Sequence, residues 1–198
     1  MKIFRLLVLS IVILFLVITG ISLLIPSHVR ISRAANIRAS ADEIWLQVDD
    51  MRNWKEWNPF FSKVPASEIH YTDAKGDKPA ATKIDGTLIQ LKEKKPDERI
   101  YVMNTKGRKT VINGWKFINN SVGDSSTLQW YIDFNLRWYP WEKFASLLFE
   151  RSYGVRIEEG LRNIKKTVEK GRTSLYQNSS GRLFVDLSHF YQIQKIIL

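Results

Sequence analysis

Apolar and polar side chains alternate along the middle of the chain, over residues 82–136. The alternation is clearest near its end, where every second residue is large and apolar: Leu128, Trp130, Ile132, Phe134 and Leu136. A period of two residues is typical of strands with one buried face. We expect strands over residues 81–85, 87–92, 99–104, 111–118 and 126–136. Because turn-forming connections such as Lys106-Gly107 separate them, an antiparallel meander is predicted.

The pattern changes to helical spacing over residues 141–170. The apolar positions there recur every three or four residues: Phe144, Leu147, Leu148, Ile157, Leu161, Ile164 and Val168. Pro140 suits a first helical turn and Gly171 suits a stop. One amphipathic helix is predicted, about 45 Å long at 1.5 Å per residue. Since such a helix is stabilised mainly by packing its apolar stripe, the sheet is its expected partner.

A charge-free apolar run covers residues 6–25, which is the length that a bilayer core requires. A cleaved signal peptide and a buried core helix are the alternatives. The run is longer than a usual signal-peptide core and no A-x-A-like cleavage site precedes Pro26, so we predict a retained transmembrane helix. Basic residues flank both ends and leave the orientation open, although the leader-like position favours a domain outside the cytoplasm.

Between this run and the meander the sequence predicts one strand and two helices. The strand is expected over residues 29–37. Ser40 and Glu43 form a capping-box pattern, so a helix should begin at Ala41. A second short helix or a turn over residues 51–57 should end at Asn58-Pro59. Residues 62–80 are interpreted as loop, with a possible short strand over 68–71.

Composition adds a strong basic excess, with 30 Lys and Arg against 20 Asp and Glu and a net charge of +10. This favours anionic partners, either nucleic acid or a phospholipid surface. Many of the basic residues fall near predicted hairpin turns: Lys92, Lys94, Lys95, Lys106, Arg108 and Lys109. They do not interleave with aromatic residues at strand spacing, as an RNA-binding sheet would require. We therefore interpret them as a solvated rim and expect no nucleic-acid partner.

Candidate catalytic chemistry is sparse. The chain has no cysteine, and His28, His70 and His189 match no metal-ligand spacing, so no metal or other cofactor is expected. No phosphate-binding glycine loop and no nucleophile elbow occurs in the sequence. The carboxylate of most interest is Asp133, although the alternation puts it on the opposite face from Trp130 and Phe134.

Several short motifs, in this order and separation, resemble the START-like or SRPBCC superfamily: Asp42-Glu43-Ile44-Trp45, Trp54-Lys55-Glu56-Trp57-Asn58-Pro59 and Glu158-Glu159-Gly160-Leu161-Arg162-Asn163-Ile164-Lys165. The nearest branch is that of polyketide cyclases and dehydrases, whose members commonly carry an N-terminal membrane segment. The resemblance implies an α+β helix-grip fold, in which an antiparallel sheet wraps a long C-terminal helix around an apolar cavity. We expect an anchor at residues 1–27, a START-like domain at 28–170 and a tail at 171–198. The tail suits a docked helix, a membrane contact or a disordered segment.

The predicted function is binding of a lipid or other hydrophobic small molecule by a membrane-tethered, single-pass protein. The rival interpretations are a cyclase, dehydratase or hydrolase using Asp133, Tyr101 or Tyr131, and a protein-interaction scaffold with a filled core. Nothing in the sequence sets an oligomeric state. The residues expected to line the cavity are Trp115, Phe117, Trp130, Ile132, Phe134, Leu148, Tyr153 and Ile157. Ordinary core packing is the alternative for each of the aromatic residues.

Overall fold

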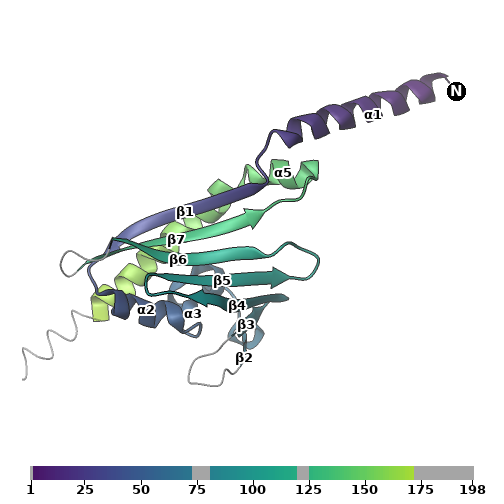
Figure 1. The fold of residues 1–198 in the computed structure, drawn as a ribbon. Coiled ribbons are helices and arrows are strands. Elements are labelled where there is room, and N and C mark those ends of the chain that lie inside the picture. The colour runs from purple at the N-terminus through teal and green to yellow at the C-terminus, as the bar shows by residue number, and fades with distance from the viewer. Residues whose placement is uncertain (1, 73–80, 120–124, 172–198) are drawn as a thin grey trace, which may run out of the picture.

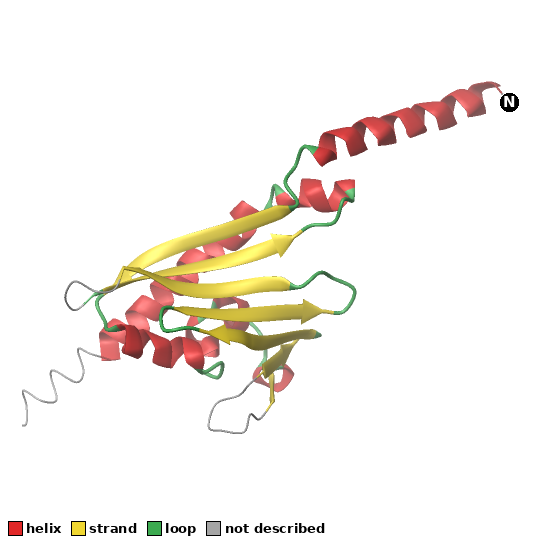
Figure 2. Cartoon of the chain, viewed as in Figure 1, coloured by secondary structure: helices red, strands yellow, loops and turns green. Residues whose placement is uncertain are grey.

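A seven-stranded antiparallel sheet forms the centre of the protein, with the order β1-β7-β6-β5-β4-β3-β2 (Figures 1 and 2). The computed structural model describes residues 2–72, 81–119 and 125–171. The strands are β1 (His28–Ile37), β2 (His70–Thr72), β3 (Ala81–Ile84), β4 (Thr87–Lys94), β5 (Glu98–Thr105), β6 (Val111–Asn119) and β7 (Ser126–Asn135). The predicted strands and the antiparallel meander are confirmed. The tail over residues 172–198 and the turn over 120–124 lie outside the described residues.

Helices cover one face of this sheet (Figure 2). They are α2 (Ala41–Asp49), α3 (Trp54–Trp57), α4 (Pro59–Ser62) and the C-terminal helix over residues 155–171. The Ser40–Glu43 capping box is present and starts α2 as expected. Asn58-Pro59 ends α3 but also begins α4, because the Asn58 side chain caps it and proline is tolerated in a first turn. The helix-grip fold is thereby confirmed.

The prediction of one continuous helix over residues 141–170 is wrong. The structure has α5 (Pro140–Ser146), a turn at 147–148, a π-helical segment η2 (Glu150–Gly154) and then the C-terminal helix. The wider π turn places Phe149 and Tyr153 against Phe134, with ring centroids 4.6 and 4.8 Å apart. Arg33 of β1 binds Glu150 of this segment and, at 2.6 Å, Glu158 of the C-terminal helix. The break lets α5 leave the direction of the C-terminal helix.

Strand β7 has the predicted buried face, since Leu128, Trp130, Ile132 and Phe134 are all buried, as is Leu136 just after the strand. Its opposite face is not simply solvent-exposed. Tyr131 and Asp133 are buried as well, because the guanidinium of Arg30 on β1 lies over both side chains. Arg30 donates two hydrogen bonds of 2.6 Å to the Asp133 carboxylate.

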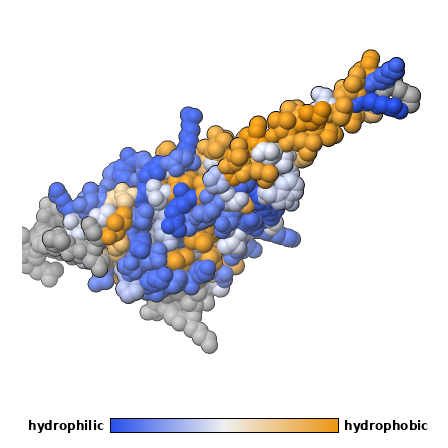
Figure 3. All heavy atoms as spheres, turned by 45° about the horizontal axis from the view of Figure 1, so that its top comes forward, coloured by the Kyte–Doolittle hydropathy of each residue, from blue (hydrophilic) through white to orange (hydrophobic). Residues whose placement is uncertain are grey.

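An exposed apolar helix, α1 (Lys2–Leu23), projects from one end of the sheet (Figure 1). It is long and apolar enough to cross a membrane, and Figure 3 shows the apolar surface along its length. Its base contacts α5. Lys143 of α5 donates hydrogen bonds of 2.7 Å to the Ile25 carbonyl and the Ser27 hydroxyl, so α5 is tied to the short connection between α1 and β1.

Candidate functional site: an apolar cavity beside α5

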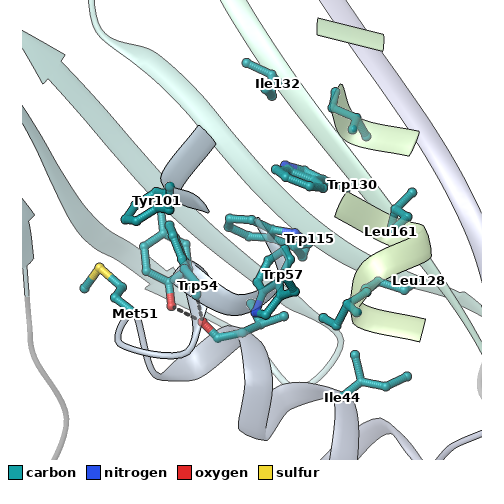
Figure 4. Packing of buried hydrophobic residues seen from close by; sticks show 14 of the residues in the cluster. Ile44, Met51, Trp54, Trp57, Tyr101, Trp115, Leu128, Trp130, Ile132 and Leu161 are labelled. Atoms are coloured by element: carbon teal, nitrogen blue, oxygen red, sulfur yellow. Dashed lines mark hydrogen bonds between the residues drawn. The ribbon is translucent and has the colours of Figure 1, made fainter. Parts of the chain in front are cut away.

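One part of the core is filled by stacked aromatic side chains (Figure 4). Trp54, Trp57, Trp115 and Trp130 are each 0% exposed, and Trp115 and Trp130 stack with ring centroids 5.3 Å apart. Trp54 also packs edge-on against Tyr101 at 4.9 Å. This part of the space between sheet and helices is therefore closed by indole rings and has no room for a ligand.

Beyond the indoles the core opens into a cavity of about 580 Å³, a size typical of small-molecule sites. The sheet, helix α4 and the segment that carries Phe149 and Tyr153 enclose it. Its walls are mainly apolar, and the residues that form them include Phe60, Phe61, Val64, Ile84, Ile89, Met103, Val111, Ile132, Phe134, Leu136, Phe149 and Tyr153. Such walls favour a ligand with a hydrophobic body.

Two buried amides supply polarity within these walls. Asn58 is 1% exposed and Asn113 is 4% exposed, and both line the cavity. The Asn58 Oδ1 accepts a 3.0 Å hydrogen bond from the Phe60 backbone N–H, and the Asn113 Oδ1 accepts a 2.6 Å bond from the Trp130 indole. Within the described part of the chain, neither side-chain NH₂ group has a partner. The two amides can therefore donate to an acceptor on a ligand.

The opening of the cavity lies at the end of the sheet where α1 joins. Its exposed lining residues come from the β3–β4 turn, the β5–β6 turn, the end of β7 and α5: Asp85, Gly107, Arg108, Lys109, Asn135 and Ala145. Strand register places these turns together, because Thr87 pairs with Thr105. The same end holds the start of β1, since His28 pairs with the lining residue Asn135. The cavity therefore opens next to the base of α1.

The eight residues predicted to line the cavity are distributed over three places. Ile132, Phe134 and Tyr153 line it. Leu148 is 67% exposed and lies outside the lining, because the turn after α5 directs it away from the sheet. The other four lie in the packed core: Trp115, Phe117, Trp130 and Ile157. A direct ligand contact by any of the eight stays a prediction.

Sequence reasoning did not find Asn58 and Asn113. Asn113 occupies a strand position where alternation puts it on the same face as Trp115, and a polar residue on a buried face is the signal that marks it. Asn58 stands before a proline, which predicts a helix end. Its second role at the cavity depends on how α4 packs, which no local pattern encodes.

The three residues considered as proton donors lie outside the cavity lining. Asp133 is engaged by Arg30. Tyr101 donates to the Val48 carbonyl, and burial together with the nearby Asp49 carboxylate raises the pKa of its hydroxyl. Burial, and then a hydrogen bond to Glu98, likewise raises the pKa of Tyr131. All three therefore have structural partners. Across the described ranges no group of three His, Asp or Glu side chains is arranged to hold a metal ion.

Comparison with known proteins gives one family match. The sequence profile of the family described as polyketide cyclase / dehydrase and lipid transport matches residues 28–169. No curated protein matches this chain.

Solved structures resemble the fold at low sequence identity. A Thermobifida fusca protein has a TM-score of 0.52 at 16% identity, covering 71% of this chain and 93% of its own. Truncated norcoclaurine synthase from Thalictrum flavum has a TM-score of 0.50 at 14% identity, with the same two coverages. A START superfamily protein from Mycobacterium smegmatis has a TM-score of 0.49 at 15% identity, covering 71% and 97%. At such identities these likenesses concern the fold alone.

Proposed function

Because this chain belongs to the polyketide cyclase/dehydrase and lipid-transport family within the START-like proteins, we propose that it binds a lipid or similar hydrophobic molecule while α1 holds it in a membrane. The cavity between the sheet and the helices is the proposed binding site. Residues 1–27 are the proposed anchor and residues 28–170 the proposed binding domain. The family description covers both ligand transport and cyclase chemistry, so the choice between them depends on the cavity itself.

The observation that carries this proposal is the chemistry of the cavity walls. Apolar side chains form most of the lining, and Asn58 and Asn113 each keep an amide NH₂ group available there. This combination suits an amphiphile with an apolar body and a carbonyl, hydroxyl or ester oxygen that accepts a hydrogen bond. A polar metabolite would leave the apolar walls unmatched.

The proposed membrane location is supported by α1. Its 22 residues extend about 33 Å at 1.5 Å per residue, enough for a hydrocarbon core of about 30 Å. Its side chains are exposed almost throughout, so the domain does not use it as a core helix. We propose a single-pass protein with the domain outside the cytoplasm. Alkaline carbonate extraction tests the anchor, and release of the full-length chain into the supernatant would contradict it.

An enzymatic function in the same cavity is the main alternative. Several ionisable lining residues are placed at the opening: Asp85, Arg108, Lys109 and Glu142. Glu142 already accepts a 2.7 Å hydrogen bond from the Arg137 backbone. The other polar groups of the lining are amides, which do not exchange protons near neutral pH, and hydroxyls: Asn58, Asn113, Asn135, Thr87, Thr105 and Tyr153. This distribution supports binding over acid–base catalysis.

Native mass spectrometry of the detergent-purified full chain tests the proposal. We expect a retained species with the mass of a lipid or lipid-like molecule, at one copy per chain. Conversion of that molecule during incubation would favour the enzyme. A chain that stays ligand-free after incubation with lipids would favour a scaffold with no binding role.

A further inference from the structure

Helix α5 has its polar and apolar sides reversed relative to an ordinary surface helix. Its buried residues are Pro140, Lys143 and Ser146. Its outward residues, with those just before and after it, are aromatic or aliphatic, and we call them the α5 apolar surface: Trp138, Trp141, Phe144, Leu147 and Leu148. Four of the five are 59% to 67% exposed, and Phe144 is 37% exposed. A contiguous apolar surface of this kind marks an interaction site.

The hydrogen bonds of Lys143 fix this orientation of α5. Lys143 is 2% exposed, and its ammonium group is held by the Ile25 carbonyl and the Ser27 hydroxyl. The Ser146 hydroxyl donates to the Lys143 carbonyl at 2.6 Å. Turning α5 over to hide its aromatic side would break the two bonds that Lys143 donates to the connection between α1 and β1. The apolar side is therefore fixed outward.

The location of α5 identifies its partner. Ile25 ends the charge-free run that begins at Leu6, so a bilayer spanned by α1 has its boundary near Ile25. Lys143 lies within hydrogen-bond distance of that boundary residue. Trp and Tyr side chains gather at such interfaces because one end of the ring is apolar and the other is polar. Here Tyr139 stacks on Trp141 with centroids 4.7 Å apart, next to Trp138 at 5.0 Å.

Basic side chains flank the aromatic ones. Arg137 donates a 3.2 Å hydrogen bond to the Gly107 carbonyl, which joins the β5–β6 turn to the segment before α5. That turn carries Lys106, Arg108 and Lys109, all exposed. An apolar surface beside a group of Lys and Arg is the arrangement with which interfacial elements bind anionic phospholipids.

We propose that the α5 apolar surface lies in the headgroup region of the bilayer that α1 spans, with the adjacent basic turn on the phosphates. This inference rests on the proposed membrane anchoring. It also gives the cavity an access route, because Glu142 and Ala145 of α5 belong to the cavity lining. The opening then faces lipid, and the ligand class is one that resides in the bilayer and passes along α5 into the cavity.

Spin-label accessibility in the full-length protein tests this placement. The chain has no cysteine, so each introduced cysteine is the single labelling site. The test variants are Leu147→Cys and Leu148→Cys, in nanodiscs of phosphatidylcholine and phosphatidylglycerol. Leu14→Cys in α1 reports insertion of the anchor, and Lys166→Cys on the exposed side of the C-terminal helix is the aqueous control. Molecular oxygen concentrates in lipid, whereas a nickel chelate stays in water.

We expect the labels at 147 and 148 to be more accessible to oxygen than to the nickel chelate, as the label at 14 should be. They should lie at a shallower depth in the bilayer than the label at 14. The label at 166 should show the reverse. Labels at 147 and 148 with the aqueous pattern, while 14 shows the lipid pattern, would overturn the docking and leave the anchor intact. Low access to both reagents would also overturn it, because a second copy or residues 172–198 would then cover the surface. An aqueous label at 14 would overturn the anchor itself.

Discussion

The ammonium group of Lys143 donates a 2.7 Å hydrogen bond to the carbonyl oxygen of Ile25. The two residues are separated by 118 positions, and this bond joins the element beside the cavity opening to the base of α1. The orientation of a buried lysine is restricted when its ammonium group donates to backbone and hydroxyl oxygens. A side chain turned another way would lose those acceptors. The pair therefore determines which side of α5 faces outward.

Replacing this lysine should loosen α5. In Lys143→Met the Ile25 carbonyl and the Ser27 hydroxyl lose their donor, and the free energy of unfolding should fall by about 1 to 3 kcal/mol. Hydrogen exchange of the α5 amides, followed by mass spectrometry, should become faster. Lys166→Met, at an exposed position, is the matched control. Equal α5 exchange in both variants would show that the bond does not hold the helix.

Trp130 should behave as a core residue. It is 0% exposed, stacks on Trp115 and donates a 2.6 Å hydrogen bond to Asn113. Trp130→Ala should lower the free energy of unfolding by about 3 to 5 kcal/mol in chemical denaturation. A much smaller loss would mean that the indole borders ligand space.

Gly160 permits the C-terminal helix to approach β7. A Cβ atom at this position would overlap the Trp130 ring and lie 3.1 Å from Pro59 Cδ. Gly160→Ala should therefore destabilise the domain by about 1 to 3 kcal/mol, although alanine favours helix. Gly171→Ala meets nothing within 4 Å and should be close to neutral. If both variants unfold at the same denaturant concentration, the close approach has no energetic role.

The sequence predicted the sheet and the buried face of β7 because burial on one side imposes a period of two, which is visible without any tertiary information. It also predicted the packing of the C-terminal helix through Ile157, Leu161 and Ile164. The same reasoning failed for apolar residues that are exposed. Leu147 and Leu148 have helical spacing, but they are exposed and lie on the outward side of α5.

The cavity could not be predicted from the residue pattern, for a different reason. Empty space depends on where packing stops, and Trp115 and Met103 look alike in an alternation pattern although one is packed and the other lines the cavity. The family resemblance implied a cavity, whereas the identity of its lining residues and of the two amides depends on tertiary packing.

Asp49 should make stability depend on acid pH. Burial raises the pKa of its carboxyl, but hydrogen bonds from Arg99 at 2.6 Å and Lys94 at 2.9 Å outweigh this and leave the pKa below the ordinary 3.8. A carboxyl with a lower pKa in the folded state stabilises the fold above its unfolded-state pKa, and this contribution disappears as the pH falls through the folded-state pKa.

The corresponding measurement is urea denaturation between about pH 6 and pH 2. Stability of the unmodified chain should decline with acid, and Asp49→Asn should be less stable at neutral pH and decline less steeply. Asp42→Asn, at an exposed carboxylate of α2, should keep the original slope. Parallel curves for Asp49→Asn and the unmodified chain would contradict the ion-pair assignment.

Ligand occupancy in variants at two neighbouring positions of β5 tests the central claim, binding of a lipid in the cavity, most directly. Met103 lines the cavity, whereas Val102 projects from the opposite face of the sheet. Native mass spectrometry of the full chain after incubation with lipid vesicles should show bound lipid in the unmodified protein and in Val102→Trp. It should show little or none in Met103→Trp, where the indole occupies the binding space. Equal occupancy in the two variants, both folded, would contradict binding in this cavity.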